Sequence, residues 1–287
     1  MFEGFVEERL AVDGAQLRVR HGGTGPAVVL LHGHPRTHTT WHRVAPALAG
    51  DHTVVCPDLR GYGRSSKPPT DARHSPYSKR AMANDIAQLM TALGHERFAV
   101  VGHDRGSYVA ARLALDHPTR VERLVVLDSV PIGDALRLAD ARFAAAWWHW
   151  FFLGQETKPA ERVIDSDPLA WYGGDPVLMG GENYGDYLAA IRDPEVVHAM
   201  CEDYRAGLGV DRAADDEDAA AGRRIECPVL MLWAARDDLG ELYGDPLEVW
   251  RSWATNLRGG PIDSGHHMAE EAPEELVLHL RRFLSEG

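Results

Sequence analysis

The feature that most constrains the fold is a series of short apolar runs separated by segments with helical periodicity. Each run is four to six residues long, is apolar throughout and ends near Gly, Asp or Pro. Strands that are buried on both faces of a sheet have this pattern. The runs occupy residues 27–31, 52–56, 98–101, 124–127 and 228–233.

The segments between these runs have the pattern of amphipathic helices. Residues 78–93, for example, place Met82, Ile86 and Leu89 on one face and end before Gly94, at a C-cap position. Alternating strands and helices predict an α/β fold with a mostly parallel sheet and helices on both faces.

The alternation is interrupted once, because no comparable strand pattern occurs between residues 131 and 222. We therefore expect a core made of residues 1–130 and 223–287 and a helical cap made of residues 131–222. The acidic run at 215–218 near the end of this cap is expected to be a solvated face.

Composition narrows the class of function. The chain has 287 residues, 45% of them hydrophobic, and a formal net charge of -13. It has no stripe of Lys and Arg, so neither nucleic acid nor an anionic membrane is an expected partner. No apolar stretch approaches the roughly 20 residues that a membrane span needs, and the N-terminus is acidic. We expect a cytoplasmic protein that acts on a small molecule.

The run at residues 98–101 leads into the sequence Gly102-His103-Asp104-Arg105-Gly106. This is the spacing of the G-x-S-x-G nucleophile elbow, a tight turn between a strand and a helix, with Asp in place of Ser. The alternative is an ordinary helix N-cap, a position at which Asp is common. We interpret Asp104 as a candidate nucleophile at the carboxyl end of the sheet.

A catalytic triad would need an acid and a late histidine in the chain. His266, after the short strand pattern at 261–262, is the candidate base, and His267 is the weaker one. The residues alone leave the acid open, because Asp128 follows one strand while Asp237 and Asp238 follow another.

The loop after residues 27–31 reads His32-Gly33-His34-Pro35. In this architecture the loop supplies one backbone N–H of an oxyanion hole, assigned to His34, and Arg105 supplies the other. The nearby histidines are not expected to converge on a metal, because the Pro and the tight loop oppose it. No metal or organic cofactor is predicted.

An aspartate nucleophile favours attack on a saturated carbon with a leaving group, which forms an enzyme ester. Water activated by a histidine then attacks that ester, with the oxyanion hole stabilising the charge. Hydrolytic dehalogenation and epoxide opening fit this chemistry, and esterase activity does not.

Several stretches together resemble the fluoroacetate (haloacetate) dehalogenases of the α/β-hydrolase superfamily. They extend through most of the chain and are weakest between about 155 and 195. The matching stretches are HGHPRTHTTWHRVAP (32–46), PDLRGYGRSSKP (57–68), PYSKRAMA (76–83), GHDRGS (102–107), VVLDSVP (125–131), HWFFL (149–153), MCEDYRAG (200–207) and IDSGHHMAEEAP (262–273).

The resemblance implies a role for each residue of the site. It implies Asp104 as nucleophile, His266 as base and Asp128, in preference to Asp237, as the acid, and it implies that Arg105 binds the carboxylate of the substrate. The implied donors to the leaving halide are His149, Trp150 and Tyr204.

The chain departs from the family pattern in two places. Tyr108 stands where the family has a second carboxylate-binding arginine, so it would give the carboxylate one neutral hydrogen bond, and Arg36 is a candidate replacement for the charge. Losing a charge-assisted hydrogen bond costs roughly 1.5–3 kcal/mol. His34 stands where the family has an apolar aromatic residue, which affects the shape of the pocket.

These observations predict an enzyme that converts a 2-haloacetate to glycolate and halide. The first alternative is an epoxide hydrolase or a dehalogenase of neutral substrates, because tyrosines replace part of the anion-binding pattern. The second is a catalytically silent relative that binds a small molecule. A homodimer is plausible because the cap is rich in aromatic residues.

Overall fold

The predicted strands form the centre of an eight-stranded sheet in the computed structural model, which describes residues 1–286. The strand order is β1-β2-β4-β3-β5-β6-β7-β8, and all pairs from β4 to β8 are parallel. The parallel strands are β3 (Ala27–Leu31), β4 (Thr53–Pro57), β5 (Phe98–His103), β6 (Val121–Leu127), β7 (Val229–Ala234) and β8 (Leu257–Ile262). The prediction of an α/β-hydrolase type of sheet is confirmed.

Two antiparallel strands at one edge, β1 (Val6–Val12) and β2 (Ala15–Gly23), were not predicted. Apolar and polar residues alternate at the start of β2, and consecutive charged residues interrupt β1, so neither strand has the continuous apolar run of the central strands. Leu17 and Val19 of β2 are fully buried. An edge strand that is solvated in part needs only such isolated apolar positions.

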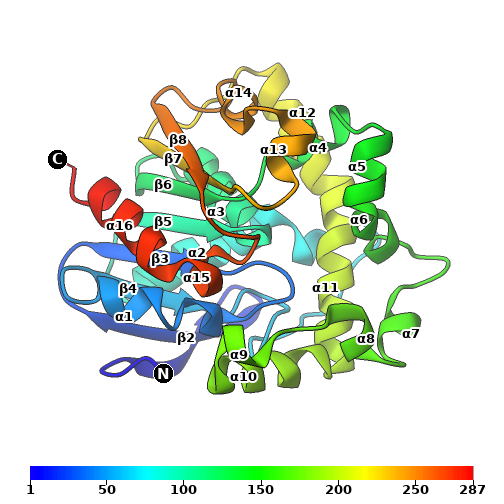
Figure 1. Cartoon of the computed structure of the whole chain (residues 1–287), viewed down its shortest axis with the longest axis horizontal. Helices are drawn as coiled ribbons and strands as arrows, with labels where there is room; N and C mark the ends of the chain where they lie inside the picture. The colour runs from blue at the N-terminus through cyan, green and yellow to red at the C-terminus, as the bar shows by residue number, and fades with distance from the viewer. Residues whose placement is uncertain (287) are drawn as a thin grey trace.

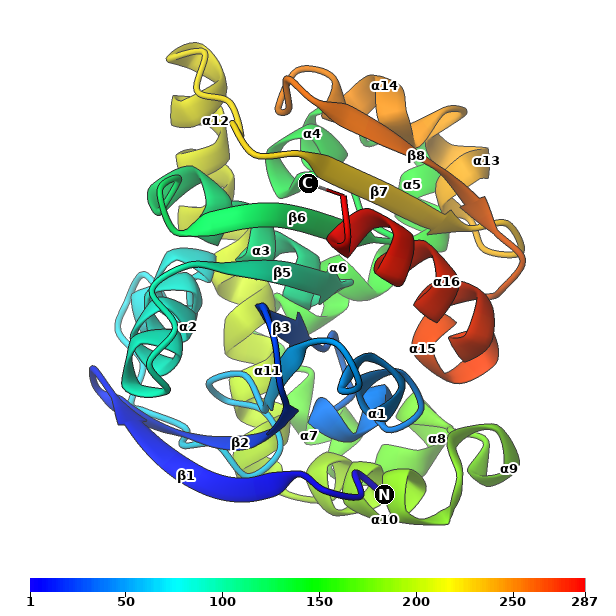
Figure 2. The same cartoon turned by 90° about the vertical axis from the view of Figure 1, so that its left-hand side faces the viewer.

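Helices cover both faces of the sheet, as Figure 2 shows. On one face lie α2 (Lys79–Ala92) and α3 (Arg105–Asp116), and on the other lie α1 (Val44–Leu48) and α16 (Pro273–Leu284). Successive residues of β3 serve the two layers, because Val29 packs with the α2 and α3 side and Val28 with the α1 and α16 side. Both are fully buried, which explains why the strand is apolar throughout.

The chain between β6 and β7 is helical. The helices of this segment are α4 (Ile132–Arg137), α5 (Ala141–Ala146), α6 (Trp148–Leu153), α7 (Glu161–Ile164), α8 (Pro168–Tyr172), α9 (Pro176–Met179), α10 (Gly181–Ile191), α11 (Pro194–Ala206) and α12 (Arg212–Ala220), with a π-helical segment, Gly207–Asp211, before α12. Of these, α5, α6, α7, α8 and α11 lie at the right of Figure 1, with α12 at the top and α9 and α10 at the bottom. Within residues 1–286, no helix is both long and apolar enough to cross a membrane.

The acidic run on α12 is solvated only in part, because Asp216 and Glu217 are exposed while Asp215 and Asp218 pair with an arginine of the core. Arg112 of α3 donates to Asp218 at 2.5 Å and to Asp215 at 3.0 Å. Asp215 also accepts the backbone N–H of Gly133 at 3.0 Å. The spacing of acids along α12 cannot reveal a partner on another helix, which lies about a hundred residues earlier in the chain.

Candidate active site

Asp104 lies on the turn between β5 and α3 with a left-handed φ of 48°, a strained conformation for a residue with a side chain. Two glycines permit the turn. A Cβ on Gly102 would lie 2.3 Å from the carbonyl oxygen of Gly106, and one on Gly106 would lie 2.4 Å from that of Leu31. Asp104 makes no N-cap hydrogen bond to α3. Asp104 therefore has the geometry of a nucleophile elbow and is not a helix N-cap.

The nucleophile candidate is ionised and held by backbone N–H groups. His34 donates its backbone N–H to Oδ2 of Asp104 at 2.7 Å. Burial opposes the charge, but the positive charge of His266 and the backbone N–H of Arg105 prevail and lower the pKa of the Asp104 carboxyl. Of the two predicted oxyanion donors, His34 donates directly to this carboxylate, while the N–H of Arg105 contributes to its low pKa.

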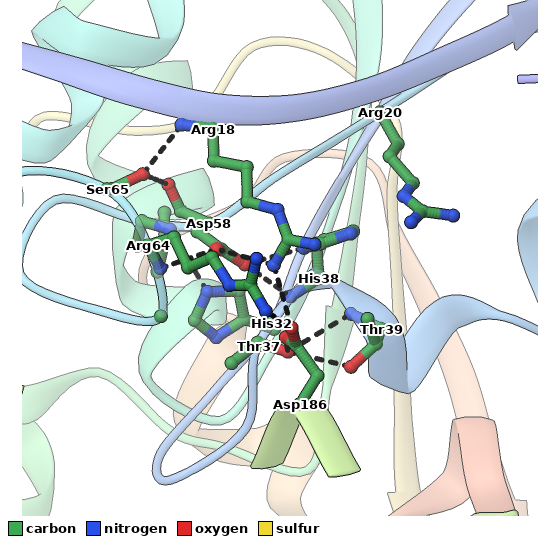
Figure 3. Close-up of polar contacts among 12 residues, drawn as sticks. Arg18, Arg20, His32, Thr37, His38, Thr39, Asp58, Arg64, Ser65 and Asp186 are labelled. Carbon is green, nitrogen blue, oxygen red and sulfur yellow. Dashed lines mark hydrogen bonds and ion pairs between the residues drawn. The ribbon is translucent and has the colours of Figure 1, made fainter. Parts of the chain in front are cut away.

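Asp58, after β4, holds the loop that carries His34 from the core side. It accepts the backbone N–H of His38 at 2.9 Å and its Nδ1–H at 2.6 Å. Its other oxygen accepts the backbone N–H of Arg64 at 2.9 Å. Both His38 and Asp58 are fully buried, so these bonds are shielded from water (Figure 3).

Asp186 of the cap helix α10 holds the same loop from the other side. In Figure 3 its side chain lies between Thr37 and Arg18. It accepts the Thr37 hydroxyl at 2.8 Å and Nη1 of Arg18, from β2, at 2.9 Å. The loop that positions the His34 N–H is therefore tied to both the core and the cap.

His266, between β8 and α15 (Met268–Glu271), contacts two carboxylates through one nitrogen. Its Nδ1 is 2.7 Å from Oδ2 of Asp128 and 3.2 Å from Oδ2 of Asp237. Burial would lower the pKa of His266, but the hydrogen bond to Asp128 and the nearby Asp237 carboxylate raise it well above its usual value. Asp238 is not a partner, because it accepts the indole N–H of Trp147 at 2.8 Å.

His103 packs against His266, the candidate base, and hydrogen-bonds to its backbone. This role was not predicted from the sequence, although His103 directly precedes Asp104. Its ring lies 4.7 Å from that of His266, centroid to centroid, and its Nε2–H donates to the His266 carbonyl at 2.7 Å. Burial lowers the pKa of His103 to about 3, so the ring is neutral. His267, the weaker candidate base, also borders the site.

A cavity of about 240 Å³ lies between the carboxyl ends of the strands and the cap. All the predicted site residues except Arg105 line this cavity, and so does Asp237, the second acid that contacts His266. The lining residues are His34, Asp104, Tyr108, Asp128, Ala146, Trp147, His149, Trp150, Tyr204, Asp237, Asp238, His266 and His267.

The three predicted halide donors meet at the cap side of this cavity. The ring of Tyr204 lies 6.0 Å from that of His149 and 6.4 Å from that of Trp150, centroid to centroid. Burial lowers the pKa of His149 to about 4 and raises that of the Tyr204 phenol, so each keeps a neutral donor. Within residues 1–286 no protein group occupies these donors, which leaves them for a ligand.

Arg105 does not line the cavity, contrary to what its implied role would suggest. Its side chain is buried and donates to Asp203 of α11 through Nε at 3.0 Å and Nη2 at 2.9 and 3.1 Å. Its guanidinium carbon lies 4.2 Å from the centroid of the Tyr204 ring. Only Nη1 has no partner in the described chain. Carboxylate binding by Arg105 stays a prediction, and it depends on Nη1.

The other departures from the family pattern have clear positions. Tyr108 lines the cavity, and burial raises the pKa of its phenol, which therefore stays protonated. The idea that Arg36 replaces the missing charge is wrong, because its guanidinium forms two hydrogen bonds of 3.0 Å with Glu270. His34 packs edge-on against Tyr204, with the two ring centroids 5.1 Å apart.

This fold and site define a hydrolase of the α/β class with aspartate at the nucleophile position, and the model of the alpha/beta hydrolase fold family matches residues 26–273. The crystal structure of an α/β hydrolase from Nostoc sp PCC 7120 superimposes with a TM-score of 0.95, at 41% identity and covering 100% of both chains.

The sequence is 41% identical to a fluoroacetate dehalogenase from Burkholderia sp, over 100% of this chain and 96% of the relative. It is 31% identical to a soluble epoxide hydrolase from Corynebacterium sp. (strain C12), over 96% of this chain and 95% of the relative. The chain therefore belongs to the fluoroacetate dehalogenase family of the α/β-hydrolase superfamily.

Proposed function

We propose that this enzyme is a hydrolytic dehalogenase of small 2-haloacids, which converts a haloacetate to glycolate and halide through an ester of Asp104. The observation that carries the proposal is the placement of an ionised Asp104, held by the His34 N–H, in one cavity with His266. The 41% identity to a fluoroacetate dehalogenase supports the same reaction.

In the first half-reaction a carboxylate oxygen of Asp104 attacks the α-carbon. Because Oδ2 is held by His34, Oδ1 is the oxygen that forms the new carbon–oxygen bond as the carbon–halogen bond breaks. The halide leaves with the electron pair. The N–H and O–H groups of His149, Trp150 and Tyr204 are the donors available to it.

In the second half-reaction His266 takes a proton from water, and the hydroxide attacks Cγ of Asp104. The charge that develops on Oδ2 is stabilised by the backbone N–H groups of His34 and Arg105. The bond between Cγ and the ester oxygen then breaks. The proton on His266 passes to glycolate, and the remaining proton of the attacking water is released from Asp104 to solvent, so that Asp104 is a carboxylate again.

The substrate carboxylate would be recognised by the buried Nη1 of Arg105 and by the hydroxyl of Tyr108. Asp203 already neutralises much of the Arg105 charge. Recognition of the acid therefore depends on one charged donor and one neutral donor. We expect weaker discrimination for a carboxylate than two arginines would give.

A second candidate function is hydrolysis of a neutral substrate, either an epoxide or an uncharged haloalkane. The observation that favours it is the charge of the cavity wall. In the part of the chain that the structure describes, this wall carries Asp104, Asp128, Asp237 and Asp238 but no lysine or arginine. Tyr108 and Tyr204 supply the phenols that protonate an opened epoxide oxygen.

One set of assays tests both candidates. The purified enzyme is incubated with fluoroacetate, chloroacetate, chloroacetamide and styrene oxide, and free halide and diol are measured. Halide from the acids at a higher kcat/KM than from chloroacetamide supports the first candidate. Diol without halide, or halide only from the amide, supports the second. Neither product from any substrate would indicate a silent, ligand-binding relative.

A further inference from the structure

We propose that Asp237 is a second positioning carboxylate for the catalytic histidine, so that a pair of acids, Asp128 and Asp237, orients His266 in place of a single one. The inference rests on the proposed function only in taking His266 as the base. It assigns a task to a residue that a conventional triad does not use.

The two acids reach the same nitrogen from the ends of adjacent strands. Asp128 follows β6 and is anchored, because its Oδ1 accepts the backbone N–H of Ala234 at 2.9 Å while Oδ2 contacts His266. Asp237 follows β7, and its Oδ2 lies 3.2 Å from the same Nδ1. Nδ1–H thus donates to Asp128, and the Asp237 carboxylate lies close enough to the same nitrogen to form an ion pair with the imidazolium.

The position of Asp237 is fixed by the backbone around it. Arg236 donates its N–H to the carbonyl of Ser264 at 3.0 Å, and Ala235 donates to that of Ile262 at 2.9 Å. These bonds join the turn after β7 to the segment that leads into His266. Asp238, one residue further on, accepts from Trp147 instead, so neighbouring acids of the same turn have different partners.

The second acid matters when the base becomes charged. As His266 takes a proton from water, the imidazolium is stabilised by both carboxylates, and each holds the tautomer that leaves Nε2 free as acceptor. Loss of one acid therefore leaves the other in place. The titratable or charged groups that influence His266 are Asp104, Asp128, Asp237, Asp238, His103, His149 and His267.

The pH dependence has a definite sign. Hydrolysis needs neutral His266, so kcat rises with pH through the pKa of His266, which the hydrogen bond to Asp128 and the nearby charge of Asp237 raise well above its usual value. Removing the Asp237 charge lowers that pKa, because one stabiliser of the imidazolium is lost. The rising limb of the pH profile therefore moves to lower pH in the Asp237→Asn variant.

The test compares Asp128→Asn, Asp237→Asn and the double variant. A lone triad acid costs about 10⁴-fold in kcat when it is replaced by asparagine. With two acids, we expect about a 10- to 100-fold loss for Asp128→Asn and about a 3- to 10-fold loss for Asp237→Asn, with little change in KM, and about 10⁴-fold only for the double variant. The matched control is Asp263→Asn, an exposed acid that pairs with Arg236.

A second readout needs no turnover. The Nδ1 proton and the titration of His266 are followed by NMR in the unreacted enzyme, so the inference is tested even if the proposed substrates are wrong. A lower His266 pKa in Asp237→Asn, but not in Asp263→Asn, supports the inference. It is overturned if Asp128→Asn alone is as inactive as the double variant, or if Asp237→Asn matches the control in pH profile and NMR.

Discussion

The backbone N–H of His34 donates to Oδ2 of Asp104 at 2.7 Å, which makes the two oxygens of that carboxylate unequal. One oxygen is held where charge develops during ester hydrolysis, while the other is free to attack carbon. The oxyanion site is thus formed before any substrate arrives, and it requires no rearrangement of the elbow.

The first prediction follows from this division of roles. Asp104→Asn keeps the side-chain volume but removes the anionic nucleophile, so turnover should fall by at least about 10³-fold. In the parent enzyme, a single turnover in ¹⁸O-labelled water should place the label in Asp104, which mass spectrometry of the peptide detects. Label in glycolate alone would mean that water attacks the substrate directly.

The second prediction concerns recognition of the substrate acid. Tyr108→Arg adds a cation beside the cavity, and the resulting charge-assisted hydrogen bond should raise kcat/KM for chloroacetate about tenfold relative to chloroacetamide. Tyr108→Phe serves as the matched variant that removes only the hydroxyl, and it should lower the ratio of acid to amide. Equal ratios in all three proteins would show that position 108 does not select for charge.

Sequence patterns predicted the central sheet, the elbow and the order of the catalytic groups because these features depend on neighbouring residues. The Gly-x-Asp-x-Gly pattern centred on Asp104 and the Gly265-His266 pair near the end of the chain are local signals of this kind. The partner of Arg105 is not local. Asp203 lies 98 residues away on a cap helix, and nothing in the spacing of either residue reveals the pair.

The choice between the triad acids shows the same limit. The sequence left Asp128 and Asp237 as alternatives, since each follows a strand whose end faces the site. The structure brings both to one nitrogen of His266, through a turn whose path depends on backbone hydrogen bonds to the segment before that histidine. A pattern that assigns one acid to one triad cannot anticipate two carboxylates beside the same nitrogen.

The third prediction tests the halide donors. Trp150→Phe retains the aromatic packing against Tyr204 and removes the indole N–H. Fluoride needs strong hydrogen bonding as it leaves, so kcat for fluoroacetate should fall about 10- to 100-fold, and kcat for chloroacetate by less. Release of both halides is measured by ion-selective electrode. An equal fall for the two substrates would indicate a packing defect and not a lost donor.

The fourth prediction concerns stability. A Cβ on Gly106 would lie 2.4 Å from the carbonyl oxygen of Leu31, so α3 and β3 would have to separate. Gly106→Ala should reduce the free energy of unfolding by about 1–3 kcal/mol or more. The matched change is Gly181→Ala, where a Cβ meets nothing within 4 Å, and it should be neutral or slightly stabilising. Chemical denaturation of both variants checks the difference.

The fifth prediction addresses the contact between the cap and the loop after β3 that carries His34, here called the oxyanion loop. Asp186 links Thr37 of that loop to Arg18, and Asp186→Asn removes one of the carboxylates that pair with Arg18 while keeping the size of the side chain. Arg18 keeps its two hydrogen bonds to Glu7, so only one charge-assisted hydrogen bond is lost and we expect a destabilisation of about 1–2 kcal/mol. The loosened loop should also hold the His34 N–H less firmly.

We therefore expect kcat of the Asp186→Asn enzyme to fall about 3- to 10-fold, with a smaller change in KM, since the His34 donor acts mainly on the charge of the transition state. Glu182→Gln is the matched control, because this exposed acid lies on the same helix and contacts only the N-terminal amine. Steady-state kinetics and thermal unfolding are compared for both. If Asp186→Asn lowers stability but leaves kcat at the control value, the contact anchors the cap without positioning the oxyanion loop.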